Sequence, residues 1–194
     1  QHYPRPRVSA LVAMTDHGAD VAYVRGMGQA GYRLGSCADL IRARDHGVDP
    51  DYVRGLAAAG YRRLPFETVL RARDHGVDPD FIGTYRAFGY PNLAIEDLIE
   101  LRDHGVDAAY LQAMKELGYA RRSIEQLRAA RDHGVDRAYL TGMAEAGFAG
   151  APLERLIAAR DHGVDGAFAR RVRARRGRVV TLDEMIALRD RGER

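Results

Sequence analysis

Residues 44–49 read Arg-Asp-His-Gly-Val-Asp, and this hexapeptide decides the fold because it returns at one fixed spacing. It begins again 29 residues later each time, at Arg73, Arg102, Arg131 and Arg160. The same frame contains a variant at Thr15 and a degraded form at Arg189, which makes seven starts without an insertion or a deletion. A constant spacing is typical of repeats that share one shape and contact only their neighbours, as in a solenoid.

Each repeat carries the start and stop signals of two short helices. The glycine of the hexapeptide ends the first helix as a left-handed cap, and the following valine supplies the apolar contact of that cap. The aspartate after the valine starts the second helix, because its carboxylate accepts hydrogen bonds from the first amides. A second glycine ends that helix. The stop glycines of the hexapeptide are Gly47, Gly76, Gly105, Gly134 and Gly163.

The repeat predicts an all-α fold, an α-solenoid of six helix pairs followed by a C-terminal capping helix. Helices of about ten residues are marginal alone, so stacking between repeats must stabilise them. We expect an extended lead-in over residues 1–7 and a single solenoid domain over 8–194. Its units start near residues 8, 36, 65, 94, 123 and 152, and the cap covers 181–194. In that cap Arg191 and Glu193 replace the His and Val of inner repeats, as suits a terminal surface.

The composition is that of a folded protein and excludes several classes. The chain has 194 residues, of which 46% are hydrophobic and 29% charged, the ordinary range of globular domains. No apolar run reaches the roughly 18 residues of a membrane helix, and the amino end lacks the order of a signal peptide. A single cysteine, Cys37, excludes an internal disulfide framework and leaves the compartment open. The chain begins with Gln, so we expect it to be part of something longer.

Six histidines form one column, just before each first stop glycine. They are His17, His46, His75, His104, His133 and His162. Imidazole is a common metal ligand. Packed helices lie roughly 8–10 Å apart, however, so equivalent side chains two helices apart do not meet on one ion. We expect a structural role, in which each ring caps carbonyls at its helix end, and no metal site; pH sensing is the alternative.

Two further columns follow from the same frame. An aromatic residue stands at the third position of each second helix, at Tyr23, Tyr52, Phe81, Tyr110, Tyr139 and Phe168. A base-stacking platform is one interpretation, but the position within a capped helix favours core packing. The arginine and aspartate that open each hexapeptide also form columns, and we expect the arginine of one repeat to reach the aspartate of the next. Exposed pairs of this kind are worth about 0.2–1 kcal/mol each.

Positions that break or vary the repeat are the candidate binding residues. From Ala169 to Val180 there is no acidic residue but there are six arginines, Arg170, Arg171, Arg173, Arg175, Arg176 and Arg178. A solvated terminal helix and an anionic partner are the two interpretations of this segment. Two exposed columns vary between repeats: Arg42, Arg71, Glu100, Ala129 and Ala158, and Arg25, Arg54, Gly83, Gln112, Thr141 and Arg170.

These observations predict a binding protein and not an enzyme. The sequence contains no nucleophile elbow, phosphate-binding loop, HExxH pair or CxxC motif. Neighbouring Asp and His in a helix point about 100° apart, so they form no catalytic dyad. We expect a scaffold for protein–protein interaction that needs no cofactor. The alternative is binding of nucleic acid or another anionic surface through the arginine-rich C-terminal helix, which salt would weaken strongly.

The run from Leu40 to Arg54, Leu-Ile-Arg-Ala-Arg-Asp-His-Gly-Val-Asp-Pro-Asp-Tyr-Val-Arg, resembles a short bacterial helical repeat. Similar tandem repeats are appended to membrane-embedded zinc metallopeptidases of the beta-lactam-sensor type and to other bacterial regulatory proteins. The resemblance covers residues 8–194 and implies a bacterial interaction or sensory module, cytoplasmic or periplasmic. The zinc motif of those peptidases is absent, so no catalytic residue is carried over. The chain departs from the repeat pattern at Ala19, at Arg128 and in its arginine-rich final pair.

Overall fold

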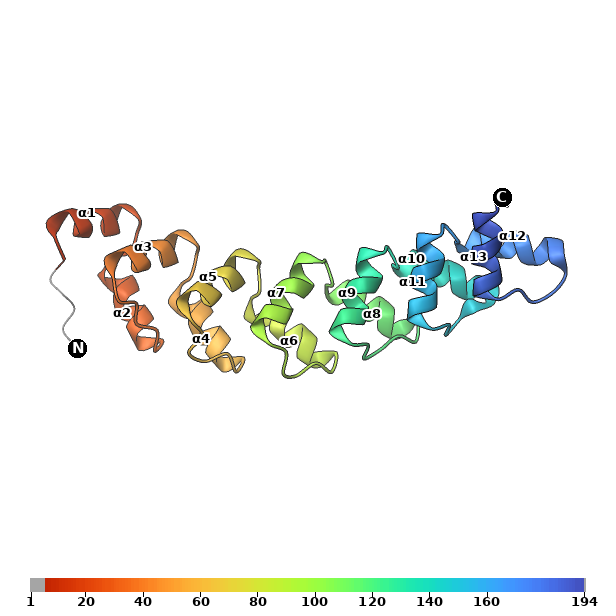
Figure 1. The fold of residues 1–194 in the computed structure, drawn as a ribbon. Helices are drawn as coiled ribbons and strands as arrows, with labels where there is room; N and C mark the ends of the chain where they lie inside the picture. The colour runs from red at the N-terminus through yellow and green to blue at the C-terminus, as the bar shows by residue number, and fades with distance from the viewer. Residues whose placement is uncertain (1–5, 194) are drawn as a thin grey trace. The chain divides into compact units, whose positions relative to one another are not determined.

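The computed structural model of the chain describes residues 6–193, and all regular structure in that range is helical (Figure 1). The all-α solenoid predicted from the repeat is confirmed, and nearly all helices have nine residues. A π-helical turn, Ala144–Phe148, continues α10. The α-helices of the described range are α1 (Val8–Asp16), α2 (Val21–Gln29), α3 (Cys37–Asp45), α4 (Pro50–Ala58), α5 (Phe66–Asp74), α6 (Pro79–Ala87), α7 (Ile95–Asp103), α8 (Ala108–Glu116), α9 (Ile124–Asp132), α10 (Arg137–Met143), α11 (Leu153–Asp161), α12 (Gly166–Arg176) and α13 (Leu182–Asp190).

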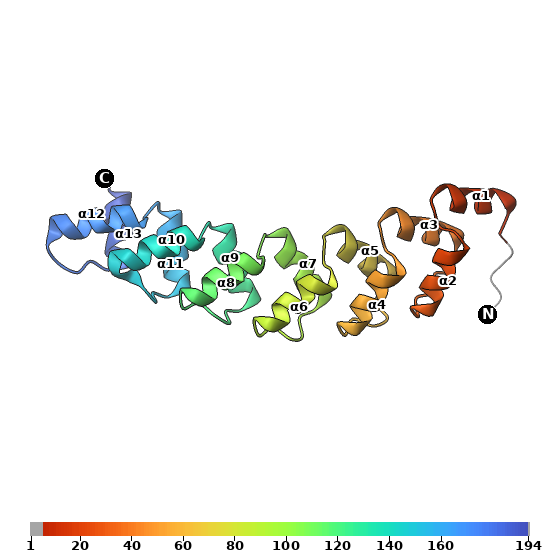
Figure 2. The ribbon, with the colours of Figure 1, turned by 180° about the vertical axis from the view of Figure 1, so that it is seen from behind.

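Helices pack against the helix two positions along the chain, which is the contact pattern of stacked helix pairs. The chain divides into two compact parts, Gln1–Ala87 with Pro91–Ile99, and Phe88–Tyr90 with Glu100–Arg194. In the first part α1 contacts α3, α2 contacts α4, and α4 contacts α6. In the second part α8 contacts α10, α9 contacts α11, α10 contacts α12, and α11 contacts α13. Within each part the odd-numbered and even-numbered helices form two rows (Figures 1 and 2).

The helix ends follow the signals of the sequence. Ser123 and Thr181 form capping boxes with Gln126 and Glu184. Gly105 has φ of 66°, the left-handed conformation that a stop glycine supplies. At the start of each second helix an aspartate accepts a hydrogen bond of 2.7–2.8 Å from the amide three residues on, as predicted for Asp20, Asp49, Asp78, Asp107, Asp136 and Asp165.

The aromatic column is core, as predicted. Its side chains are all buried, from Phe168 at 1% exposed to Phe81 at 8%. All four of its tyrosines also donate a hydrogen bond to a carbonyl of the next repeat: Tyr23 to Val48 (2.7 Å), Tyr52 to Val77 (2.8 Å), Tyr110 to Val135 (3.1 Å) and Tyr139 to Leu156 (2.9 Å). Buried rings of this kind offer no face to a nucleic-acid base.

A second tyrosine column, which follows the second stop glycine of each repeat, makes another contact between neighbouring repeats. Such a recurring contact is called a joint below. Each hydroxyl donates to a carbonyl 32 residues further on, at 2.6–3.2 Å; the pairs are Tyr32–Leu64, Tyr61–Leu93, Tyr90–Arg122 and Tyr119–Ala151. Burial raises the pKa of both Tyr23 and Tyr32 to about 12. The phenols therefore stay neutral and act as donors at ordinary pH.

The two ends of the described chain can be compared with the expected lead-in and cap. The expected lead-in over residues 1–7 lies mostly outside the described residues, but Arg7, just before α1, is extended, with φ −66° and ψ 151°. At the other end Arg191 is exposed, as expected of a polar cap. No helix within residues 6–193 is both long and apolar enough to cross a membrane. One domain over 8–194 stays a prediction.

Candidate functional site

The histidine column belongs to the joints between repeats. The Nδ1 atom of His17 lies 2.8 Å from Oδ1 of Asp45, in the next repeat. The ring does not cap its own helix as expected, because the amides of the stop glycine and the next residue already bond those last carbonyls. The same histidine–aspartate contact, at 2.6–2.7 Å, joins His46 to Asp74, His104 to Asp132, His133 to Asp161 and His162 to Asp190.

These joints lie at the surface. Each histidine and aspartate side chain in them is about half exposed. Among residues 6–193 no three His, Cys, Asp or Glu side chains lie close enough together to hold a metal ion. In each of these five joints the Nδ1 atom of the ring lies within hydrogen-bond distance of a carboxylate oxygen.

The arginine column contacts the preceding repeat, so the expectation that it reaches the next aspartate is wrong. That aspartate is bound to a histidine, and the guanidinium turns back over an aromatic ring, a cation–π contact. Arg131 also donates from Nε to the carbonyl of Gly105 at 3.1 Å. The distances from guanidinium carbon to ring centroid are 5.4 Å for Arg44–Tyr23, 4.9 Å for Arg73–Tyr52, 5.2 Å for Arg131–Tyr110, 5.1 Å for Arg160–Tyr139 and 5.0 Å for Arg189–Phe168.

The arginine-rich segment is partly neutralised by acids from other segments. Three of its arginines form ion pairs: Arg170–Glu145 (3.1 Å), Arg176–Glu193 (2.9 Å) and Arg178–Glu184 (2.8 Å). Arg173 lies over the ring of Phe148, 4.3 Å from its centroid. Within the described range, Arg171 and Arg175 are left without a hydrogen bond, ion pair or ring contact. Half of the six positive charges of this segment are therefore paired with an acid.

The two variable columns differ in how far they are engaged. Arg42 makes two 2.9 Å hydrogen bonds to Glu67 and lies 5.3 Å from the Phe66 ring centroid, so it is held by the next repeat. Arg71, at the equivalent position, is exposed. In the second-helix column Thr141 is exposed and lies beside a groove.

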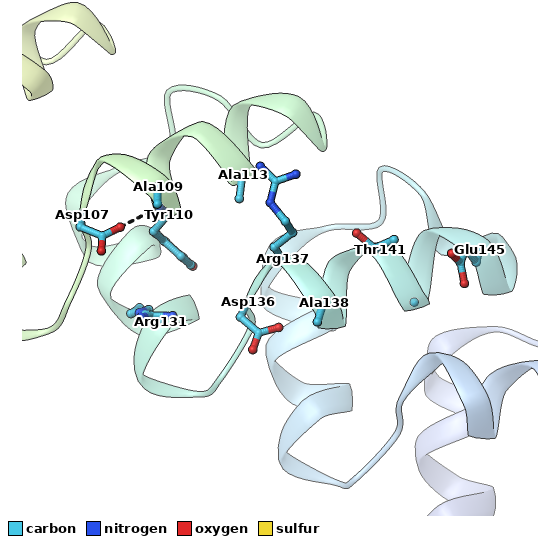
Figure 3. A pocket seen from close by; sticks show the side chains of 11 residues that line it. Asp107, Ala109, Tyr110, Ala113, Arg131, Asp136, Arg137, Ala138, Thr141 and Glu145 are labelled. Atoms are coloured by element: carbon cyan, nitrogen blue, oxygen red, sulfur yellow. Dashed lines mark hydrogen bonds between the residues drawn. The ribbon is translucent and has the colours of Figure 1, made fainter.

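That groove, of about 690 Å³, lies between α8 and α10 (Figure 3). Its surface is formed largely by small residues, Ala109, Ala113, Ala138, Thr141 and Gly142. Charged side chains of both signs line its edge, namely Asp107, Arg131, Asp136, Arg137 and Glu145. The sequence analysis missed the groove because it forms only where small residues of two successive repeats face the same space.

The charges at the edge of this groove are mostly paired. Arg137 lies 2.6 Å from Glu116, and Gln112 together with Arg137 holds the pKa of Glu116 below its usual value. Asp107 and Asp136 accept hydrogen bonds from the amides of Tyr110 and Tyr139 as helix caps. The groove therefore combines a small-residue surface with edge charges of both signs, most of which are engaged in contacts within the chain.

A second groove, of about 540 Å³, lies where the first and second repeats meet, between α1 and the first turns of α2 and α3. Leu11, Met14, Val21, Val24 and Leu40 are among the residues that line it, so it is mainly apolar. The neighbouring surface exposes four large apolar side chains, Val8 (78%), Leu11 (48%), Val12 (54%) and Val21 (64%). Exposed apolar residues gathered in one place are typical of interaction sites.

Sequence comparison adds no relative to this description. No family model matches the chain, and no curated protein matches it. What characterises the chain is the regular succession of helix pairs at 29-residue spacing, joined by repeated histidine–aspartate and tyrosine–carbonyl contacts.

Proposed function

We propose that the chain is a non-enzymatic repeat scaffold that binds a protein partner in the groove between α8 and α10. The observation that carries this proposal is that the side chains repeated in every unit differ in their contacts from those around the groove. The repeated histidines, arginines and tyrosines are engaged in contacts between repeats, whereas Ala109, Ala138 and Thr141 are exposed around an open groove. A concave surface with small residues and a few polar groups suits a peptide or a helix of another protein.

The charges around the groove favour a protein over a nucleic acid. A phosphate backbone is bound by several cations that are not already neutralised. Here Arg137 pairs with Glu116, and Arg131 lies over the Tyr110 ring. A protein surface with charges of both signs would complement an edge that itself carries both signs, and this supports protein binding.

The same groove supports a non-enzymatic role. Two of the carboxylates at its edge, Asp107 and Asp136, are occupied as helix caps. No histidine, cysteine or serine is among the residues that line it. The resemblance of the run from Leu40 to Arg54 to repeats of bacterial regulatory proteins supports the finer proposal, an interaction or sensory module of a larger bacterial protein.

The test is to place a charge in the groove and to compare it with an equivalent position elsewhere. Ala138→Glu introduces a carboxylate into the groove at an exposed helical position. Ala22→Glu is the matched control, since Ala22 is the equivalent residue of α2 and is also exposed. Aspartate stands naturally at this position in α4 and α6, at Asp51 and Asp80, so both variants should fold.

We expect the partner, identified by photo-crosslinking from position 138 in an extract of the native host, to bind the Ala138→Glu variant at least about tenfold more weakly. The Ala22→Glu variant should bind it with unchanged affinity. Equal affinity for both variants, or crosslinks that nuclease treatment removes, would contradict the proposal.

A further inference from the structure

A third cavity lies in the first part of the chain, between α2, α4 and the loop of residues 59–65 that joins α4 to α5. It holds about 380 Å³, within the roughly 300–1,000 Å³ of small-molecule sites. Val53, Leu56 and Val69 form its buried side, since each is at most 7% exposed. Three further side chains enlarge the apolar lining, namely Tyr32, Tyr61 and Leu64. This cavity, called the α2–α4 cavity below, therefore offers a largely apolar surface.

Two successive arginines of the loop, Arg62 and Arg63, are the charged residues among those that line the α2–α4 cavity. Both are exposed. The Nε atom of Arg62 donates to the carbonyl of Ala57 at 3.3 Å, which holds its guanidinium at the end of α4. Within residues 6–193 no acidic side chain pairs with either arginine. Two positive charges that are not neutralised therefore accompany the apolar surface.

The helix ends beside the cavity do not cancel these charges. The C-termini of α2 and α4 each carry about half a negative charge, or about −1 together, against +2 from the two arginines. At the end of α4 the carbonyl of Ala57 also accepts hydrogen bonds from the amide of Gly60 and from Arg62. The charge at the rim of the cavity is therefore positive and suits an anion.

The backbone of the loop supports the same conclusion. Arg63 has φ of 60°, a left-handed conformation that disfavours residues with a Cβ atom. Gly150, at the equivalent position of a later loop, has φ of 71° and meets that conformation without strain. In the described part of the chain the amides of Arg62, Arg63 and Leu64 donate no hydrogen bond. Successive free amides beside a left-handed residue are typical of anion-binding turns.

The equivalent arginine of another loop is used differently. Arg121 is also left-handed, with φ of 54°. Its side chain covers Gly89, where an added Cβ would lie 3.3 Å from the Nε atom of Arg121. Arg63 does not cover Gly31, the glycine at the same distance before it: of the described residues beyond its own neighbours, none has an atom within 4 Å of a Cβ there. Gly31 lines the α2–α4 cavity, which therefore stays open because Arg63 does not fold back.

We propose that the α2–α4 cavity binds a small carboxylic acid with an apolar chain, such as a short fatty acid. Guanidinium groups bind carboxylates through paired N–H donors, so Arg62 and Arg63 receive the head of the ligand. Its chain covers Val53, Leu56 and Val69. A phosphate backbone has no apolar chain for this cavity, so a nucleic acid fits it less well. The proposal does not depend on the groove between α8 and α10.

The test titrates the full chain with octanoate in a calorimeter. We expect saturable binding at one site per chain, with a Kd below about 1 mM. Acetate has the charge without the chain, and 1-octanol has the chain without the charge, so each should bind at least about tenfold more weakly. Hexanoate should also bind about tenfold more weakly than octanoate, because each buried methylene is worth a factor of roughly three to four.

Arg63→Gly removes one guanidinium and keeps a residue that accepts the left-handed conformation. It should weaken octanoate binding at least about tenfold. A purely structural role for Arg63 predicts a lower urea midpoint, whereas we expect the midpoint to stay or to rise because the strain is relieved. Arg121→Gly is the matched control, since it makes the same backbone change in a loop outside the cavity, and it should leave the affinity unchanged.

Two-dimensional NMR locates the ligand. Octanoate should shift the amide resonances of Gly31 and of residues 62–64. Shifts confined to the apolar groove of α1, α2 and α3 would overturn the proposal, as would octanol that binds as tightly as octanoate, equal binding by Arg63→Gly and the parent chain, or no saturable binding. A short peptide ending in leucine that binds more tightly than octanoate would also overturn it, and would identify the end of a protein chain as the occupant.

Discussion

Substituting alanine for Gly166 should force α10 and α12 apart. Gly166 is the first residue of α12 and faces the backbone of α10. A Cβ at this position would lie 2.1 Å from the carbonyl oxygen of Gly142 and 2.3 Å from its carbon. Both are backbone atoms that cannot rotate away, so one helix has to move by about 1 Å to reach normal contact.

The expected cost follows from two opposing effects. Overpacking of a tight interface costs about 1–3 kcal/mol. Alanine favours a helix over glycine by at most about 1 kcal/mol, and by less at the first helical position. We therefore expect a net loss of about 1–2 kcal/mol, or roughly 2–8 °C in melting temperature for a chain of this length.

The opposite glycine provides the control. A Cβ at Gly142 would lie 3.7 Å from the Cα atom of Gly166, an ordinary contact. Gly142→Ala should therefore leave stability unchanged or raise it by up to about 1 kcal/mol. Each variant adds one methyl group to one residue of this pair, and only the methyl group at Gly166 points at the backbone of the other helix.

Urea titrations followed by circular dichroism measure the two variants. Repeat arrays need not unfold in one step, so hydrogen exchange of the α12 amides should accompany the titrations. Gly166→Ala should exchange faster in α12, and Gly142→Ala should not. If Gly166→Ala is as stable as the parent chain, α10 and α12 do not approach as closely as described and the reasoning is refuted.

Three further predictions concern single joints. Gly105→Ala should cost about 1 kcal/mol in a urea titration, because φ of 66° is unfavourable for alanine while the neighbouring arginine leaves room for its methyl group; an unchanged midpoint would argue against a left-handed cap. Above pH 10 stability should fall, since the folded state holds the Tyr23 proton up to a pKa of about 12 and the unfolded state releases it near 10; phenolate absorbance that rises near pH 10 with the helices intact would contradict this. Arg173→Gln should lower stability by about 1 kcal/mol through loss of its contact with the Phe148 ring, whereas Arg171→Gln should have no effect in the same titration; equal midpoints would show that the ring contact contributes nothing.

The helix boundaries were accessible from the sequence because their signals are local. An aspartate that caps the amide three residues on, or a glycine that permits positive φ, acts within one turn of the chain. Asp49 and Gly47 therefore fix a helix start and a helix stop without reference to the rest of the fold. The fixed spacing of these signals then predicts stacking, and with it the burial of the aromatic column.

The partners of the joints were not accessible in the same way. Arg44 and His46 lie two residues apart, and which of them meets an aspartate depends on the lateral offset between stacked helices. In the structure His46 takes Asp74 and Arg44 lies over Tyr23. Periodicity along the chain carries no information on that offset. The predicted contact between the arginine of one repeat and the aspartate of the next is therefore wrong.

The arginine-rich segment shows the same difficulty. Its sequence between Ala169 and Val180 has no acid, but Glu145 precedes it and Glu193 follows it at a distance that only the folded chain closes. The segment stood out in the sequence because these twelve successive residues include no Asp or Glu. A search for acids one repeat away would have found Glu145, which lies 25 residues before Arg170.

The span of the joints has a consequence for how such a chain can change over evolutionary time. The histidine, first tyrosine and second tyrosine joints connect residues 28, 25 and 32 positions apart, so each depends on one adjacent repeat alone. Unequal recombination that removes or duplicates 29 residues therefore brings together a new pair of neighbours that carry the same histidine and aspartate, although the phenol is missing where Phe81, Phe148 or Phe168 replaces a tyrosine. The array can gain or lose whole units while each surviving joint reforms, and a gene for this chain can vary the length of its product without first having to evolve a new interface.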